Sequence, residues 1–157
     1  MLKYIGIALV FAAALIPVLD FRKRGERASL EYDCLLELIG IIEKNLRYMR
    51  PVGEAVRSYS SPSASHIFAE GGAGELLSSP RSVIDRLSVS PEVRCELIGY
   101  FTRLGVGTQA EELSRASSMR ELLSAARSAD RESHRTALRV RTAVCLFFGL
   151  TLVIILI

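Results

Sequence analysis

The last fifty residues of the chain, 108–157, constrain its fold more than any other stretch. They contain no proline and a single glycine, Gly149, so little in them interrupts a helix. The part up to Arg141 is polar and rich in arginine, whereas residues 142–157 (TAVCLFFGLTLVIILI) carry no charge. A helix that is charged along most of its length and then purely apolar is typical of a rod that enters a bilayer.

A second apolar stretch lies near the other end of the chain. Residues 2–19 are interrupted only by Lys3, and as a helix they would reach roughly 27 Å, against a hydrocarbon core of about 30 Å. A cleaved signal peptide would carry its positive charge before the apolar run, but here the basic residues Arg22, Lys23, Arg24 and Arg27 follow it. The small residues 12–14, which could resemble a cleavage site, lie inside the run. The pattern therefore favours an anchor whose following residues are cytoplasmic.

The same asymmetry of charge marks the second apolar block. Arg135, Arg139 and Arg141 precede it, and no charged residue follows. Its sixteen residues would span roughly 24 Å, which a snorkelling Arg141 can extend. The sequence therefore predicts a transmembrane helix over 2–19, a cytoplasmic helical domain over 20–141 and a second transmembrane helix over 142–157. Both termini would lie on the opposite side, with no folded part there.

The charge of the middle region excludes one class of function. It holds 19 of the 20 Lys and Arg residues and all 17 Asp and Glu residues, which gives a net charge of +2. A nucleic-acid-binding domain would show a strong basic excess, and the absence of Trp removes the best base-stacking side chain. We therefore expect no nucleic-acid partner.

The middle region has the periodicity of helices and no convincing alternation of strands. A stripe at three- and four-residue steps runs from Leu35 to Met49 within a helix expected over 21–49, after a kink at Pro17, and Gly40 suggests a close helix contact there. Shorter helices are expected over 51–59, 62–69, 80–87 and 91–104, the last two begun by Ser-Pro pairs. Gly105 suits a left-handed cap. Thr108 and Glu111 match a capping box that begins the long C-terminal helix. The expected fold is an all-α bundle between two transmembrane helices.

No constellation of residues supports catalysis or metal binding. The cysteines Cys34, Cys95 and Cys145 are far apart and are interpreted as small buried hydrophobic residues, whereas His66 and His134 are expected to be solvated. The glycine-rich stretch 71–74 lacks the Lys-Ser/Thr pair of a phosphate-binding loop, and no nucleophile elbow occurs. A membrane hydrolase would need a catalytic group that the sequence does not contain. We therefore expect no enzyme activity, cofactor or metal.

Arginines four residues apart form a ladder along the C-terminal helix. Because like charges at this spacing repel each other, the ladder needs an explanation. One is a solvated face, and another is contact of its last members with anionic lipid headgroups. A third follows from the antiparallel hairpin that two anchors on one side require: an acidic line on the first helix would lie along the ladder and set the register of the two helices. The predicted pairing involves Glu26, Asp33 and Glu37 with Arg127, Arg131 and Arg135.

Taken in order, several motifs resemble the stage III sporulation protein AB family of endospore-forming bacteria. They are the opening Met1-Leu2-Lys3 before an anchor, Leu46-Arg47-Tyr48 followed by Pro51-Val52, the later helix and turn with Leu97, Phe101 and Leu104-Gly105, and the tail from Gly149. The resemblance covers nearly the whole chain and rests on order, spacing and length. The chain departs from the family pattern in the shortened Ser/Gly-rich stretch 58–79.

The resemblance implies a role in a channel complex of the mother-cell membrane around the forespore. The family's soluble domain resembles cytoplasmic domains of the inner-membrane platform proteins of type II secretion and type IV pilus systems. The implied function is a scaffold that docks a secretion-type ATPase and contacts other channel membrane proteins. Arg120, Arg127, Tyr48 and Pro51 are the candidate docking residues. The alternative is a two-anchor signalling adaptor that relays a hairpin movement to a soluble partner.

Overall fold

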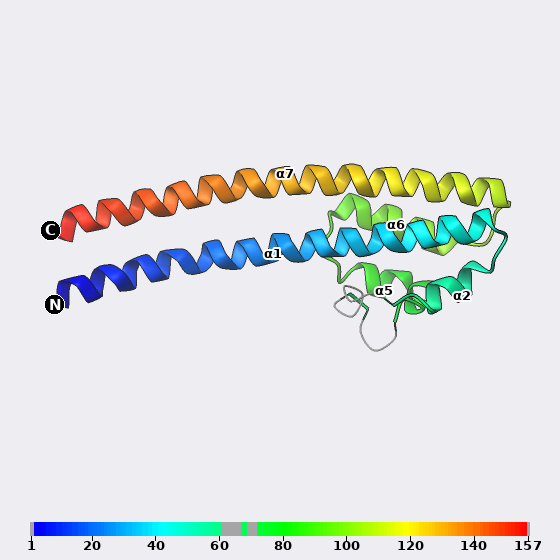
Figure 1. The fold of residues 1–157 in the computed structure, drawn as a ribbon, viewed down its shortest axis with the longest axis horizontal. Helices are drawn as coiled ribbons and strands as arrows, with labels where there is room; N and C mark the ends of the chain where they lie inside the picture. Colours follow the sequence, from blue (N-terminus) through cyan, green and yellow to red (C-terminus); the bar gives the residue numbers. More distant parts are fainter. Residues whose placement is uncertain (1, 61–66, 69–71, 157) are drawn as a thin grey trace. The chain divides into compact units, whose positions relative to one another are not determined.

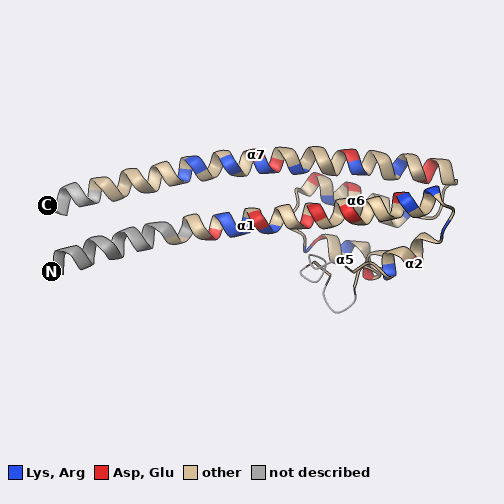
Figure 2. Ribbon diagram, in the orientation of Figure 1, with Lys and Arg blue, Asp and Glu red and all other residues tan. Residues whose placement is uncertain are grey.

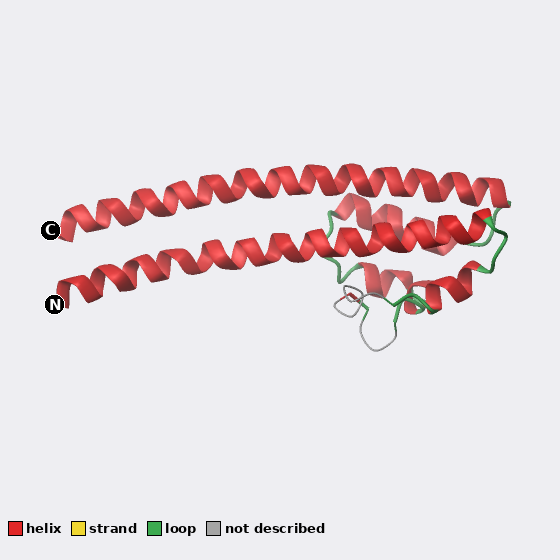
Figure 3. Cartoon of the chain, viewed as in Figure 1, coloured by secondary structure: helices red, strands yellow, loops and turns green. Residues whose placement is uncertain are grey.

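The computed structural model describes residues 2–60, 67–68 and 72–156. Its helices, in chain order, are α1 (Leu2–Arg47), α2 (Val52–Arg57), α4 (Glu75–Ser78), α5 (Pro80–Ile84), α6 (Pro91–Arg103) and α7 (Gln109–Leu156) (Figure 1). The described residues form helices and loops, with no strand among them (Figure 3). The predicted all-α class is therefore confirmed for this part of the chain.

The chain divides into two compact units. The end unit contains Met1–Arg27 and Ala129–Ile157, and the core unit contains Ala28–Ser128. The helices α1 and α7 each contribute to both units, whereas the short helices belong to the core unit alone. These boundaries lie inside the middle region of 20–141 that the sequence predicts.

Helix α1 is one element from Leu2 to Arg47, whereas the sequence suggested a separate helix from residue 21. The helix continues through Pro17 to Arg47. A proline removes one backbone hydrogen bond, but no glycine or second proline follows within the next seven residues to end the helix. The short helix expected over 62–69 lies largely outside the described residues.

The core unit is built around the predicted apolar stripe of α1. Leu35, Leu38, Ile39 and Ile42 are fully buried, and burying each side chain contributes roughly 1.5–3 kcal/mol. The residues that share this core come from every other helix and include Val56, Leu76, Ile84, Leu97 and Leu123. Met49, by contrast, is exposed, so the buried stripe ends earlier than the sequence suggested.

Within the core unit, α1 and α7 run antiparallel. Asp33 forms an ion pair with Arg127, and Glu43 forms one with Arg120 at 3.2 Å. The side-chain amide of Gln109 donates to the carbonyl oxygen of Leu46 (2.6 Å). As the residue number on α1 increases from 33 to 46, the number of its partner on α7 decreases from 127 to 109. The two helices therefore run in opposite directions.

Three of the predicted helix boundaries have the expected chemistry. The hydroxyl of Ser90 accepts a hydrogen bond from the backbone N–H of Val93 (3.4 Å), and Gly105 adopts a left-handed φ of 88°. The backbone N–H of Thr108 donates to Glu111 Oε2 (3.0 Å), while that of Glu111 donates to Thr108 Oγ1 (3.4 Å). These are the two bonds of a capping box. Ser79 occupies the corresponding position before α5, but its side chain makes no capping bond.

Gly40 is not the site of a close helix contact. A Cβ built at this glycine would meet nothing within 4 Å, so the expectation from the sequence is wrong. Close packing against α1 occurs instead at Gly25 in the end unit.

In the part of the chain that the structure describes, no helix is both long enough and apolar enough to cross a membrane.

Candidate functional site

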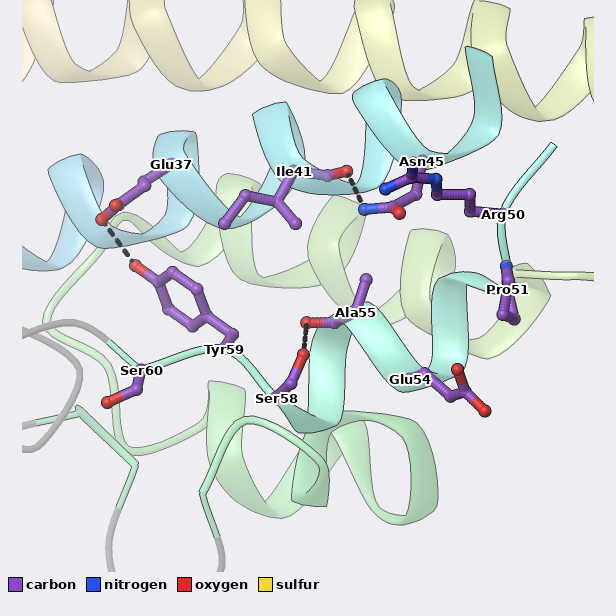
Figure 4. Close-up of a pocket in the computed structure, with 10 residues that line it drawn as sticks. All are labelled: Glu37, Ile41, Asn45, Arg50, Pro51, Glu54, Ala55, Ser58, Tyr59 and Ser60. Atoms are coloured by element: carbon purple, nitrogen blue, oxygen red, sulfur yellow. Dashed lines mark hydrogen bonds between the residues drawn. The ribbon is translucent and has the colours of Figure 1, made fainter. Parts of the chain in front are cut away.

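A groove in the core unit lies between the C-terminal half of α1 and helix α2. Its volume is about 430 Å³. Figure 4 shows that its lining residues come from α1, from the turn after it, from α2 and from the segment that follows α2. The residues that line it are Glu37, Ile41, Asn45, Arg50, Pro51, Glu54, Ala55, Ser58, Tyr59 and Ser60. Pro51, one of the predicted docking residues, therefore lies in its wall.

Tyr59 organises the polar end of the groove. Its hydroxyl donates to Glu37 Oε2 at 2.8 Å and lies 3.4 Å from the sulfur of Cys34 (Figure 4 draws the bond to Glu37). Burial raises the pKa of the Cys34 thiol, the hydrogen bond with Tyr59 opposes this rise, and the negative charge of Glu37 adds to it. Because the thiol stays protonated near neutral pH, Cys34 is not an activated nucleophile.

The remaining polar groups of the groove suit binding better than catalysis. The amide of Asn45 is turned back to the carbonyl oxygen of Ile41 (2.9 Å), and it is therefore engaged within its own helix. Arg50 and Glu54 are exposed at the other end, one of each charge. Such a surface can hold polar and apolar side chains of a partner.

The three acidic residues predicted to pair with the arginine ladder each have a different kind of partner. Asp33 pairs with Arg127, across the two long helices, while Glu37 accepts the bond from Tyr59. The ion pair that the structure gives Glu26 is with Arg22, one turn earlier on α1 (2.9 Å). Figure 2 shows the basic residues recurring along α7. Arg131 and Arg135, the other two members predicted to pair, are exposed in the end unit.

The predicted docking residues differ in how available they are. Tyr48 is 64% exposed, and Pro51 is exposed beside the groove. Arg120 is exposed but engaged with Glu43, and Arg127 is half-buried against Asp33. Arg127 therefore serves the packing of α1 and α7 in the core unit.

The end of α1 has a feature that the sequence analysis missed. The backbone N–H of Met49 bonds to Leu46 O (3.2 Å) and that of Arg50 to Asn45 O (2.9 Å), which is the Schellman pattern of a helix C-terminus. Met49 has the left-handed φ of 53° that this pattern requires. Glycine normally occupies this position, so the sequence gives no local signal for it. The Met49 side chain is 82% exposed.

A carboxylate that the sequence pattern did not reveal anchors the loop before α6. Glu31 on α1 is 3% exposed and accepts hydrogen bonds from the backbone N–H of Ser88 (2.5 Å) and from its hydroxyl (3.2 Å). These bonds satisfy a buried charge and fix the loop against α1. Only the polarity of Glu31 on an otherwise apolar face could have indicated it.

His134 in the end unit is half-buried against Phe21, whereas the sequence predicted a solvated side chain. Its ring stacks on Phe21 with 4.1 Å between centroids, and its Nε2–H donates to the Phe21 carbonyl oxygen (2.9 Å). The Arg141 guanidinium lies 3.7 Å from the centre of the same Phe21 ring. Because two groups cannot share one ring face, His134 and Arg141 cover opposite faces. A Cβ at Gly25 would lie 2.0 Å from His134 Nε2, so glycine leaves the space for the imidazole.

The cysteines and histidines provide no metal site among the described residues. Cys34 is buried as expected, but Cys95 is exposed, which corrects the prediction, and Cys145 is half-buried. Cys95 is exposed because its position on α6 lies away from the face that carries Val93, Leu97 and Phe101. His66 lies outside the described residues.

Comparisons with protein-family models, with curated proteins and with solved structures found no match.

Proposed function

We propose that the protein is a membrane-anchored scaffold. In this proposal, residues 2–19 and 142–157 span the membrane and the residues between them form a cytoplasmic docking domain. The partner is a secretion-type ATPase of a channel complex, and the membrane is the one around a developing forespore. The ATPase and the sporulation role come from the resemblance to stage III sporulation protein AB, whereas the anchoring is also supported by the end unit.

The observation that carries the anchoring proposal is the contact of Phe21 with Arg141. Phe21 follows the first apolar stretch by two residues, and Arg141 directly precedes the second. Their cation–π contact therefore brings the polar ends of both apolar stretches to the same level. Two helices that leave one membrane face side by side need this arrangement.

The exposed surface of the end unit gives independent support. Its exposed side chains include a group of large apolar residues that water would solvate poorly, namely Ile16, Leu19, Val144, Leu146, Phe147, Phe148 and Leu150. A soluble surface rarely gathers so many large apolar side chains, and contact with lipid acyl chains accounts for them.

The exposed thiol of Cys95 provides a test of the topology. In intact cells, a membrane-impermeant maleimide should leave Cys95 unlabelled, and opening the cells should allow its labelling. A Cys95→Ser variant identifies any signal from the other two thiols. Labelling of Cys95 in intact cells would place the docking domain outside the cytoplasm and contradict the proposal.

Binding of the ATPase is tested with the full chain in lipid nanodiscs. The ATPase of the same organism should be retained by loaded nanodiscs and not by empty ones. The purified chain alone should not hydrolyse ATP, and hydrolysis by it would overturn the scaffold function. Absence of ATPase binding would remove the proposed partner while leaving the topology to stand on the labelling result.

A further inference from the structure

Two turns at one end of the core unit present apolar side chains to solvent. Met49 and Val106 are each 82% exposed, and Tyr48 is 64% exposed. We call these three residues the turn patch. The only other large apolar side chain exposed in the described part of the core unit is Leu30, at 48%. The bond from Gln109 to Leu46 holds the start of α7 beside the end of α1, so the two turns lie at the same end (Figure 1).

The backbone of Met49 argues that its side chain has a use outside the fold. Its left-handed conformation at the Schellman position is one that glycine adopts without strain. The side chain is exposed and therefore contributes little packing that could offset the strain. The end of α1 accounts for the left-handed backbone but not for a side chain larger than glycine there, and a strained position that carries an exposed side chain points to a function; methionine adapts well to a partner's surface.

Basic residues adjoin the turn patch along the chain. Lys44 lies one helical turn before Tyr48, Arg50 follows Met49, and Arg103 lies three residues before Val106. All three are exposed, and none forms an ion pair within the described part of the chain. Two of the nearby carboxylates pair with arginines: Glu43 with Arg47 and Arg120, and Glu112 with Arg115. Glu54 and Glu111 are exposed and have no arginine or lysine partner among the described ion pairs, so they offset part of the basic charge. The charge that remains favours an acidic partner surface.

We propose that the turn patch is the docking surface for the ATPase, which would offer an apolar pocket bordered by carboxylates. This inference rests on the proposed function for the identity of its partner. Met49 would enter the pocket, Tyr48 and Val106 would flank it, and Arg50 and Arg103 would face the carboxylates. Apolar anchors with a charged rim are the usual anatomy of a specific protein interface.

The test uses Met49→Gly, because the backbone should accept glycine and only the side chain is lost. Binding of the ATPase to the full chain in nanodiscs should weaken about tenfold, as expected for a central interface anchor. The thermal unfolding midpoint should stay the same or rise. Val106→Ser should also weaken binding, which gives an independent measurement from the second turn.

Two matched variants serve as controls. Met49→Leu keeps an apolar side chain and should retain most of the binding, and Leu30→Ala removes an exposed apolar side chain elsewhere and should bind normally.

A change of charge tests the basic rim: Arg50→Glu should weaken binding, whereas Arg50→Lys should not. Normal binding by both Met49→Gly and Val106→Ser would overturn the proposal that the turn patch is the docking surface. The ATPase would then still be the partner, bound at another surface. No binding by the unaltered chain would overturn both proposals.

Discussion

Two glycines of α1 have opposite roles. Gly25 leaves space for the imidazole of His134, since a Cβ there would lie 2.0 Å from Nε2 and 2.1 Å from Cδ2. The imidazole is held by its stack on Phe21 and by its bond to the Phe21 carbonyl oxygen, so it cannot move away freely. A Cβ at Gly40 would meet nothing within 4 Å, so no contact requires glycine there.

Alanine substitution should separate these roles. Gly25→Ala should displace His134 from Phe21 and lose an aromatic contact of about 0.5–1.5 kcal/mol. Gly40→Ala should stabilise the protein by up to about 1 kcal/mol, because alanine favours the helix. The ring-proton chemical shifts of His134 and the unfolding midpoint of the full chain measure both effects. Unchanged shifts in Gly25→Ala would contradict the close fit.

The buried and exposed thiols should react at different rates. Burial raises the pKa of Cys34 and also shields its sulfur, whereas Cys95 is exposed. Iodoacetamide near neutral pH should therefore modify Cys95 in the folded protein and leave Cys34 intact until a denaturant is added. Mass spectrometry of the digested protein measures each site. Modification of Cys34 without denaturant would contradict its burial beside Tyr59.

At the scale of elements, the pairing of α1 with α7 combines apolar burial with cross-helix ion pairs. The buried stripe of α1 packs into the shared apolar core, and the pairs Asp33–Arg127 and Glu43–Arg120 add contacts that form in this register. Arg127 is the less exposed of the two arginines, at 28% against 58%. Of the two acids, however, Glu43 is the less exposed, at 14% against 40% for Asp33, so both pairs are partly screened by solvent and should contribute comparably.

A double-mutant cycle tests that contribution. Asp33→Asn and Arg127→Gln, alone and together, should reveal a coupling of about 0.5–1 kcal/mol in the free energy of unfolding, since the pair is partly solvent-screened. The pair Arg81–Asp85, at 3.9 Å and largely exposed, is the matched control and should show almost none. Equal coupling in the two cycles would mean that the cross-helix pair has no special role.

For the molecule as a whole, two buried acids predict a loss of stability in alkali. The pKa of Tyr100 is raised from its ordinary 10.0 by burial first and then by Glu112 and Glu43, and burial raises that of Cys34 from 9.0. Both groups hold their protons more tightly in the folded state. Their contribution to the stability of the fold is complete at pH values below their pKa values in the unfolded chain. It falls as pH rises above about 9 to 10.

Tyr100→Phe should reduce this loss. The Tyr100 hydroxyl is buried without a hydrogen-bond partner, so its removal breaks no bond and should raise stability by up to about 1 kcal/mol near pH 7. The advantage of the variant should widen above about pH 10, where unfolded tyrosine ionises. Urea unfolding of the full chain at several pH values measures it. A constant difference between the variant and the unaltered chain would show that Tyr100 does not cause the alkaline loss.

The amino-acid sequence by itself determined the features that depend on neighbouring residues. Helical periodicity placed the apolar stripe of α1, Ser90-Pro91 marked the start of α6, and Gly105 and Thr108 marked the boundary before α7. Each signal acts within about one helical turn, so the residues alone were sufficient. The same reasoning selected Pro51 as a docking residue, and Pro51 lies in the wall of the groove. The sequence did not predict the groove itself.

Only the tertiary structure decided the contacts between distant residues. The bond between His134 and Phe21 joins positions 113 apart, and those of Tyr59 with Glu37 and Glu31 with Ser88 join positions 22 and 57 apart. No local pattern encodes which faces of two helices meet, because the packing of the whole core selects the register. Met49 is the clearest case: its left-handed conformation is set by how α1 must end for α2 to follow, against the preference of its own side chain.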